Sequence, residues 1–108
     1  MEIVLREWHN SAMKKLIVDV GRAKSRQDLC TLILMAMDAP QWHGKNLDAL
    51  DESVAYGGND TIEPPYSVTL TNVGRLPVEL KRDIQIIRDI FADAKNREGR
   101  VVSCDIIE

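Results

Sequence analysis

Three carboxylates on one short stretch are the residues that this 108-residue chain offers first for chemistry. The stretch is Trp42–Tyr56, WHGKNLDALDESVAY. Successive helical residues turn by about 100°, so a helix starting at Leu47 places Asp48, Asp51 and Glu52 together on its outer side. The apolar residues that share its inner side are Leu47, Leu50 and Val54. Such an acidic face could ligate a metal, transfer protons or grip a basic partner.

Local helix physics accounts for only part of this acidic face. Asn46 is a good N-cap, because its side-chain oxygen can accept a backbone N–H, and Asp48 lies in the first turn, where the helix dipole favours negative charge. Asp51 and Glu52 lie beyond that turn and have no Lys or Arg three or four residues away. Asp48 and Glu52 repel each other at i,i+4, which costs roughly 0.2–0.5 kcal/mol. A solvated surface with no function is the alternative reading of this face.

Catalytic and metal chemistry find little support. Hard cations take several oxygen ligands from converging directions, whereas carboxylates on the outside of one helix diverge. Cys30 and Cys104 form no C-x-x-C motif, and His9 and His43 do not have the spacing of metal ligands. No Gly-rich phosphate loop or nucleophile elbow is present. We therefore expect that the protein is not an enzyme and binds no metal or cofactor; a small metal-assisted hydrolase is the least favoured of the functions considered. We expect both cysteines to be buried, reduced thiols.

Binding to a basic protein fits the sequence better. Carboxylates on a rigid helix beside an aromatic residue, Trp42, can steer and hold a cationic surface. The net charge of −3 argues against nucleic-acid binding, which needs a basic face. Two alternatives stay open here: Trp42 as a packing residue against the preceding helix, and His43 as a simple turn residue.

The length and composition indicate one ordinary globular domain, with 44% hydrophobic and 29% charged residues. The N-terminus lacks the features of a signal peptide, and no apolar run is long enough to span a bilayer. We expect a cytoplasmic monomer that contacts neither membrane nor nucleic acid. Residues 1–13 are an N-terminal extension of uncertain structure, in which Ile3, Val4 and Leu5 could form a short strand.

Strands alternate with helices along the rest of the chain. The predicted elements are a strand at Lys15–Val20 that is buried on both faces at its centre, a Ser25-capped helix ending by Ala39, the acidic helix ended by Gly57-Gly58, a strand at Tyr66–Thr71 with one buried face, a helix between Pro77 and Gly99, and a strand at Val101–Ile107. The long helix carries an apolar stripe: Leu80, Ile84, Ile87, Phe91 and Ala94. This order predicts an α/β fold in which about three to four helices pack on a small three-stranded parallel sheet.

The motif G-K-N-L-D-A-L at residues 44–50 resembles the barstar family of intracellular ribonuclease inhibitors. F-x-D-A-K at Phe91–Lys95 and the order of all elements from Lys14 onward are similar to that family as well. The resemblance implies a barstar-like domain over residues 14–108. It also implies that the acidic helix and the preceding turn plug the cationic active site of a secreted ribonuclease, with carboxylates standing in for RNA phosphates.

The resemblance also assigns roles to single residues. Gly44 and Asn46 shape the turn, Asp48 matches a contact aspartate, and Trp42 takes the place of a contact tyrosine. Asp93 falls where the family has a peripheral acidic contact, although an i,i+4 ion pair with Arg97 is the simpler interpretation of that residue.

Three positions depart from the family pattern. Glu52 replaces the family's dominant aspartate, Asp51 replaces a contact tryptophan, and His43 is the second aromatic of the turn. We therefore predict an inhibitor of a basic microbial ribonuclease, either the family's usual target or another toxin nuclease against which the chain serves as an immunity protein. The alternative is an interaction module that keeps the fold and inhibits no ribonuclease.

Overall fold

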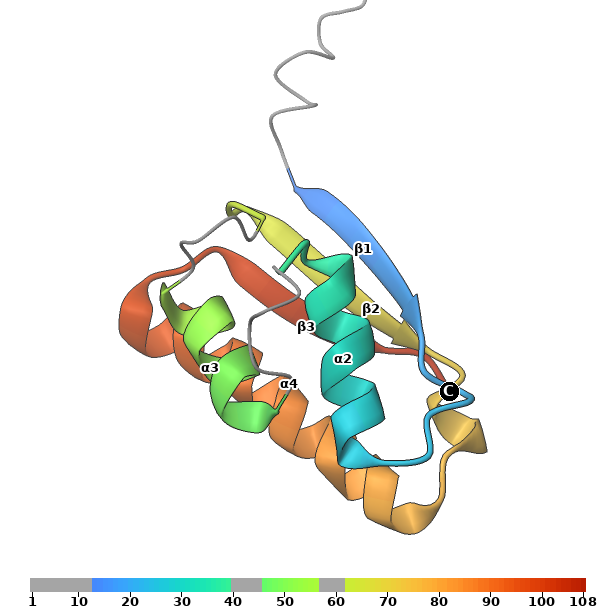
Figure 1. Cartoon of the computed structure of the whole chain (residues 1–108). Coiled ribbons are helices and arrows are strands. Elements are labelled where there is room, and N and C mark those ends of the chain that lie inside the picture. Colours follow the sequence, from blue (N-terminus) through green and yellow to red (C-terminus); the bar gives the residue numbers. More distant parts are fainter. Residues whose placement is uncertain (1–12, 40–45, 57–61) are drawn as a thin grey trace, which may run out of the picture.

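The structure, a computed structural model, describes residues 13–39, 46–56 and 62–108 (Figure 1). Its elements are β1 (Lys14–Asp19), α2 (Arg26–Ala36), α3 (Leu47–Tyr56), β2 (Tyr66–Thr71), the 3-10 helix η1 (Val73–Arg75), α4 (Val78–Glu98) and β3 (Val102–Ile106). The predicted α/β class is confirmed, with three parallel strands and three α-helices. Of the predicted N-terminal extension, only Met13 lies within the described residues, and Gly57-Gly58 lies outside them.

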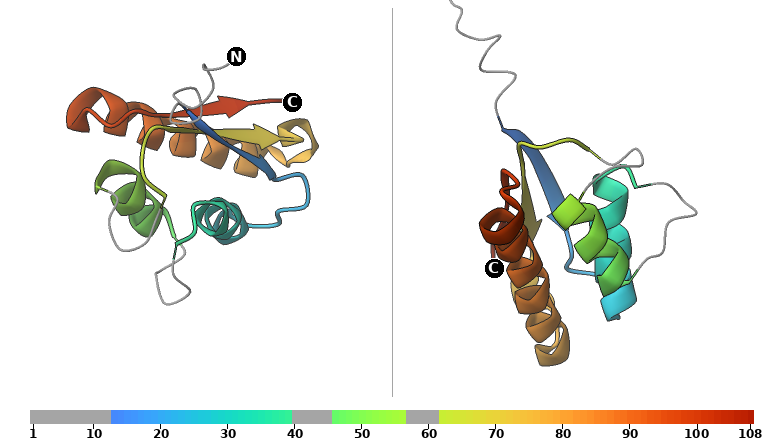
Figure 2. Two further views of the ribbon diagram at one scale, coloured as in Figure 1. Left: turned by 90° about the horizontal axis from the view of Figure 1, so that it is seen from above. Right: turned by 90° about the vertical axis from the view of Figure 1, so that its left-hand side faces the viewer.

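The three strands are parallel and follow each other across the sheet in the order β1-β2-β3. Leu16, Val68 and Cys104 lie side by side in this register. Because crossovers between parallel strands are right-handed, two crossovers that step in the same direction place their helices on the same face. Accordingly α2, α3 and α4 all lie on one side of the sheet (Figure 2).

This one-sided arrangement corrects the prediction for the first strand, which was expected to be buried on both faces. Val18 faces the helices and is buried, whereas Ile17 faces the other way and is 73% exposed. No described element covers that open face. The apolar run Leu16–Val18 resembled a central strand, but strand order, which the run itself does not encode, places it at the edge.

Helix α2 begins as predicted and ends before Ala39, as predicted. The Ser25 hydroxyl accepts a hydrogen bond from the Asp28 N–H at 3.1 Å, while the Asp28 carboxylate accepts one from the Lys24 N–H at 2.8 Å. This is a capping box in which the acid reaches one residue further back. The helix ends at Ala36, three residues before Ala39, and Asp38 takes the left-handed conformation with φ of 61°.

The core lies between the helices and the inner face of the sheet. All five residues of the predicted stripe on α4 are buried: Leu80, Ile84, Ile87, Phe91 and Ala94. Phe91 meets Tyr66 of the central strand edge to face, with ring centroids 6.5 Å apart and planes at 90°, a geometry that aromatic pairs prefer. The central strand is thereby fixed to the longest helix.

One ion pair joins α2 to α4. Arg26 donates to the Asp83 carboxylate from Nε at 3.1 Å, and its Nη2 lies 2.9 Å from the same oxygen. Asp83 is almost fully buried on a helix whose other buried residues are apolar. Since burial of an unpaired carboxylate is costly, this pair fixes the position of α2 on α4.

Two isoleucines of α4 test the burial pattern directly. We expect Ile84→Ala to lower the free energy of unfolding by about 2–5 kcal/mol, because it leaves a cavity in the packed core. Ile86→Ala removes the same atoms from a side chain that is 40% exposed, and we expect a clearly smaller loss. Urea unfolding followed by circular dichroism measures both values. Equal losses for the two variants would contradict the placement of the core.

Candidate functional site

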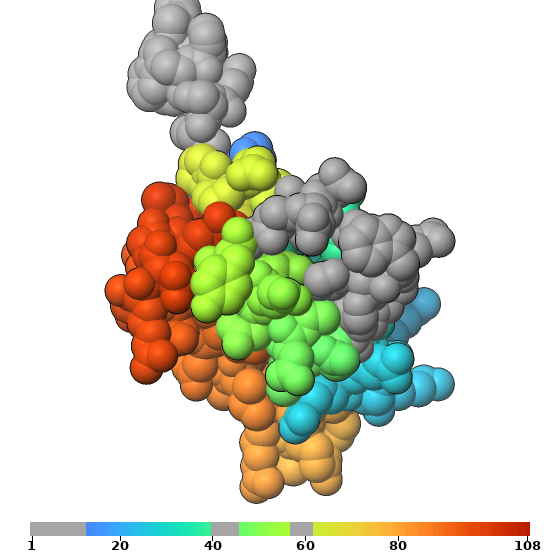
Figure 3. All heavy atoms as spheres, turned by 60° about the vertical axis from the view of Figure 1, so that its left-hand side comes forward, coloured from blue at the N-terminus to red at the C-terminus, as the bar shows by residue number. Residues whose placement is uncertain are grey.

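The candidate site is the outer side of α3, and it is held by a well-packed inner side. Leu50 and Val54 are fully buried, and Leu47 packs partly against the core. The helix bounds are those predicted from the sequence. Asp48, Asp51 and Glu52 are all exposed on the outer side, which lies on the molecular surface beside α4 (Figure 3).

The amino end of α3 is fixed by Asn46, as predicted. Its side-chain oxygen accepts a hydrogen bond from the Ala49 N–H at 2.8 Å, and its carbonyl accepts the first helical bond from the Leu50 N–H at 3.0 Å. Such a cap satisfies a backbone donor that would otherwise have no partner within the helix. The first turn of the acidic helix, including Asp48, is therefore held in one orientation.

The carboxyl end of α3 is held by a residue that the sequence analysis did not single out. Arg100 Nε donates a hydrogen bond to the Val54 carbonyl at 3.2 Å. Gly99, in the left-handed conformation with φ of 69°, ends α4 just before Arg100. A cation near the last carbonyls of a helix interacts favourably with the helix dipole. Nothing in the sequence pairs Arg100 with Val54, since the two residues are 46 positions apart.

Arg100 also lies close to the buried hydroxyl of Tyr66. Burial raises the pKa of Tyr66, and the neighbouring guanidinium partly opposes that rise. The hydroxyl therefore stays protonated at neutral pH. Arg100 thus belongs to the same structural unit as the Tyr66 and Phe91 rings, which connects the end of the acidic helix to the core.

The acidic side of α3 has no counter-charge on the same helix. Residues 46–56 contain three carboxylates and no Lys, Arg or His. The ion pairs within the described parts of the chain lie elsewhere, at Arg26–Asp83 and Asp93–Arg97. The negative charge of α3 is therefore open to solvent and to a partner.

The other predicted contacts have different outcomes. Trp42, His43 and Gly44 lie outside the described residues, so their roles stay predictions. Asp93 lies on the exposed side of α4 and forms the ion pair with Arg97 at 3.1 Å, which confirms the simpler interpretation of that residue. Its charge is partly balanced by a residue of its own helix, whereas α3 contains no basic residue.

Neither cysteine of the chain is a reactive thiol. Cys30 and Cys104 are both free thiols and both buried, as predicted. Burial raises the pKa of Cys30, and it raises the pKa of Cys104 to about 12. A thiol is nucleophilic only as its thiolate, so neither cysteine is active near neutral pH. Residues 13–39, 46–56 and 62–108 also contain no group of three or more metal-ligating side chains that could hold an ion.

A hollow of about 460 Å³ lies away from α3. Its lining comes from β1, the loop after it, α2 and η1: Asp19, Arg22, Ala23, Asp28, Thr31, Leu32 and Arg75. Two arginines and two aspartates balance each other there, so the hollow selects neither an anion nor a cation.

In the described part of the chain, no helix is long and apolar enough to cross a membrane.

Replacing Arg100 tests whether it holds α3. We expect Arg100→Met to lower the free energy of unfolding by about 1.5–3 kcal/mol, the usual range for a hydrogen bond that involves a charged group. Hydrogen exchange of the amides at the end of α3 should accelerate more than exchange in the middle of α4. The matched control is Arg97→Met, whose exposed ion pair should contribute about 0.5 kcal/mol or less. An effect no larger than that of the control would exclude this role.

The thiols give a second test. At pH 8, we expect Ellman's reagent to react with the folded protein at least about a hundredfold more slowly than with the urea-unfolded chain, because both thiols are buried and their pKa values are raised. The absorbance of the released thiolate gives both rates. Rapid reaction of the folded protein would show that a cysteine is accessible and would reopen a nucleophilic role.

Comparison with known protein families matches residues 13–106 to the barstar family, described as barnase inhibitor. The match covers the chain from Met13, directly before β1, through β3 and therefore includes α3. A search of curated proteins finds no match.

Proposed function

Since the chain belongs to the barstar family, we propose that it inhibits a basic microbial ribonuclease by placing the acidic side of α3 in the enzyme's cationic active site. The observation that carries the proposal is a rigid helix whose three carboxylates, Asp48, Asp51 and Glu52, are exposed and have no counter-charge within the helix itself. These carboxylates take the places that RNA phosphates occupy in the enzyme. In this proposal the protein blocks the cleavage of RNA by the ribonuclease and catalyses no reaction itself.

The geometry of α3 suits a competitive plug. Its carboxylates lie on a helix fixed at both ends, by Asn46 and by Arg100, so little conformational entropy is lost when the partner binds. Their joint field attracts a cationic cleft over several ångströms, which raises the association rate at low ionic strength. Because the acids repel each other on the free helix, contact with a basic surface also removes that repulsion.

The complete proposed contact surface extends beyond α3. It comprises the turn before the helix, the helix itself and one residue of α4: Trp42, His43, Gly44, Asn46, Asp48, Asp51, Glu52 and Asp93. Asn46 acts by shaping the helix start. Asp93 acts at the periphery, since its ion pair with Arg97 must loosen before it can contact an enzyme.

The departures from the family pattern concern the choice of target. Glu52 carries its carboxylate one methylene further from the backbone than an aspartate would, and Asp51 offers charge where the family has an aromatic ring. A close-fitting phosphate site discriminates sharply between such lengths. We therefore propose a toxin nuclease with a deeper or more basic cleft as the target, and an immunity role for the protein. The same departures are compatible with the second candidate, an interaction module without inhibitory activity.

A double variant tests the proposed site. Wild-type protein, titrated into assays of several basic microbial ribonucleases, should inhibit at least one of them stoichiometrically. Asp48→Asn with Glu52→Gln should raise the inhibition constant of that enzyme roughly 30-fold or more, since losing one partner of a buried charge pair costs about 2–5 kcal/mol. The control, Glu79→Gln with Asp89→Asn on the exposed side of α4, removes the same charge and should change the constant less than about threefold.

The outcomes separate the two candidate functions. Equal inhibition by the double variant and the control would show that general charge, and not the side of α3, is responsible. Absence of inhibition by the wild type against the whole panel would favour the interaction module. Circular dichroism of each variant confirms that folding is retained.

A further inference from the structure

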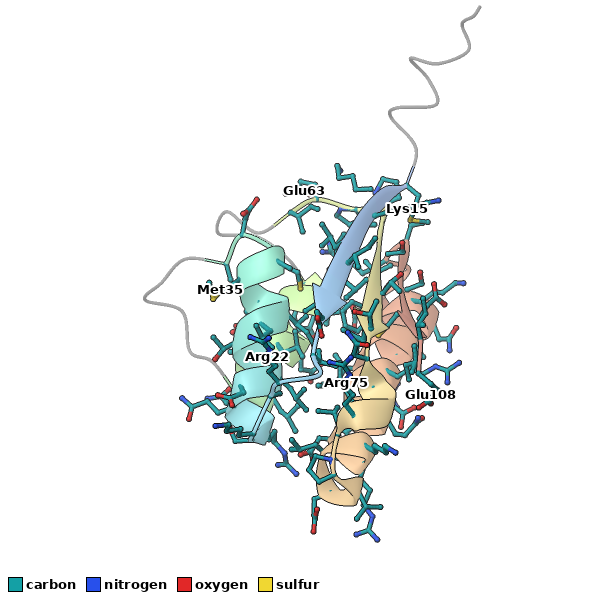
Figure 4. The ribbon with its side chains drawn as sticks, turned by 90° about the vertical axis from the view of Figure 1, so that its right-hand side faces the viewer. Lys15, Arg22, Met35, Glu63, Arg75 and Glu108 are labelled. Carbon is teal, nitrogen blue, oxygen red and sulfur yellow. The ribbon has the colours of Figure 1, made fainter. Side chains whose placement is uncertain are left out.

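The outer edge of β1 carries backbone groups that point away from the sheet. Among the residues that the structure describes, β1 is bonded to β2 only, through hydrogen bonds that include Lys14 N–H to the Pro65 carbonyl at 3.2 Å and Val20 N–H to the Thr71 carbonyl at 3.1 Å. In a parallel pair, alternate residues bond to the neighbouring strand. The N–H and C=O groups of the residues between them, Lys15, Ile17 and Asp19, therefore point outward. Figure 4 shows the molecule from the side of this strand.

The side chains of these three residues point away from the core. They alternate with Leu16 and Val18, which pack against the core, so Lys15 and Ile17 lie on the open face of the sheet. Asp19, the last residue of the strand, turns its carboxylate toward Gly21 at the end of the sheet and also lines the hollow. All three residues are exposed, and Ile17 at 73% is the most exposed large hydrophobic residue among those described. Along this edge the strand thus presents a cation, an apolar side chain and an anion in that order.

Asp19 is the negatively charged residue of these three, and its carboxylate is held in place by neighbouring groups. Its carboxylate oxygen Oδ1 accepts a hydrogen bond from the Gly21 N–H at 2.9 Å. That bond, a second one from the Asn72 side chain, and the nearby Arg75 and Arg22 lower the pKa of Asp19. The carboxylate is therefore ionised at neutral pH and retains lone pairs for another donor.

We propose that two copies of this chain pair antiparallel through their β1 edges and form one continuous six-stranded sheet. In the proposed register of the two β1 strands, Lys15 lies opposite Asp19 of the second copy, and Ile17 lies opposite Ile17 of the second copy at the two-fold axis. The outward backbone groups of these residues then face each other, as a hydrogen-bonded antiparallel pair requires. Edge pairing of this kind is a known tendency of open strands.

The charges select this register over its neighbours. A shift by two residues places one charged side chain opposite Ile17, and a larger shift places Lys15 opposite Lys15 or Asp19 opposite Asp19. Lysines on an edge strand often protect it from pairing. Here Lys14 is already engaged, since its Nζ donates to the Glu63 carbonyl at 2.7 Å, and Lys15 meets a carboxylate. The charged residues therefore specify one pairing and disfavour the others.

Such a pair would leave the candidate inhibitory site free. α3 lies on the opposite side of the molecule from the outer edge of β1 (Figure 1). The contact is one strand wide, smaller than a standard stable interface, so the dimer forms reversibly and at high protein concentration. The proposed dimer is an alternative to the monomer expected from the sequence, and it is independent of the proposed function.

Analytical ultracentrifugation up to millimolar protein tests the pairing. Wild-type protein should show a concentration-dependent dimer. Ile17→Lys, which places two like charges at the two-fold axis, should raise the dissociation constant at least about tenfold. Val78→Lys introduces the same residue at a 60% exposed site on α4 and should leave the constant unchanged. A wild type that stays monomeric, or equal effects of the two variants, would overturn the proposal.

A charge exchange tests the register. Lys15→Asp alone and Asp19→Lys alone each place like charges opposite each other and should weaken the dimer, whereas an equimolar mixture of the two variants should form a heterodimer. Failure of the mixture to associate more strongly than either variant would exclude this register. Because Asp19→Lys also removes the hydrogen bond to Gly21, circular dichroism must confirm its fold; if it does not fold, the comparison of Ile17→Lys with Val78→Lys decides the proposal.

Discussion

The constraint on which the rest of this structure depends is the order of its strands. Because β1, β2 and β3 follow each other across the sheet without a reversal, right-handed crossovers bring every helix to the same face. That face receives the whole core, including the Tyr66 and Phe91 rings and the stripe of α4. No element in residues 13–39, 46–56 or 62–108 covers the opposite face or the outer edge of β1. The strand order therefore accounts both for the packed face that supports α3 and for the edge of β1 that we propose pairs with a second copy of the chain.

The acidic helix illustrates how packing supports a surface that is locally unfavourable. Asp48 and Glu52 repel each other, and no basic residue of the helix compensates them. Burial of Leu50 and Val54 contributes far more than this repulsion costs, since a fully buried side chain of that size contributes about 1.5–3 kcal/mol. Asn46 and Arg100 then fix the two ends. The helix can thus carry three negative charges that no residue of the helix balances.

The sequence predicted those features that repeat locally. The bounds of α3 and β2 and the buried stripe of α4 follow from apolar periodicity and from turn residues, and each is confirmed. The Asn46 cap, the buried thiols and the Asp93–Arg97 pair were also predictable, because each depends on one residue or on a spacing of a few positions. At the candidate site, the exposure of Asp48, Asp51 and Glu52 followed from the same periodicity.

The features that the sequence did not predict depend on contacts between distant segments. Ile17 and Val18 have similar side chains, and the one-sided placement of α2, α3 and α4 on the sheet (Figure 2) leaves the first exposed and buries the second. Arg100 reaches Val54 from 46 residues away, and Arg26 reaches Asp83 from 57 residues away. An arginine without a local partner resembles any solvated arginine in a sequence. Residues that orient a helix from another element, as Arg100 orients α3, are for this reason the part of a candidate site that requires a structure to find.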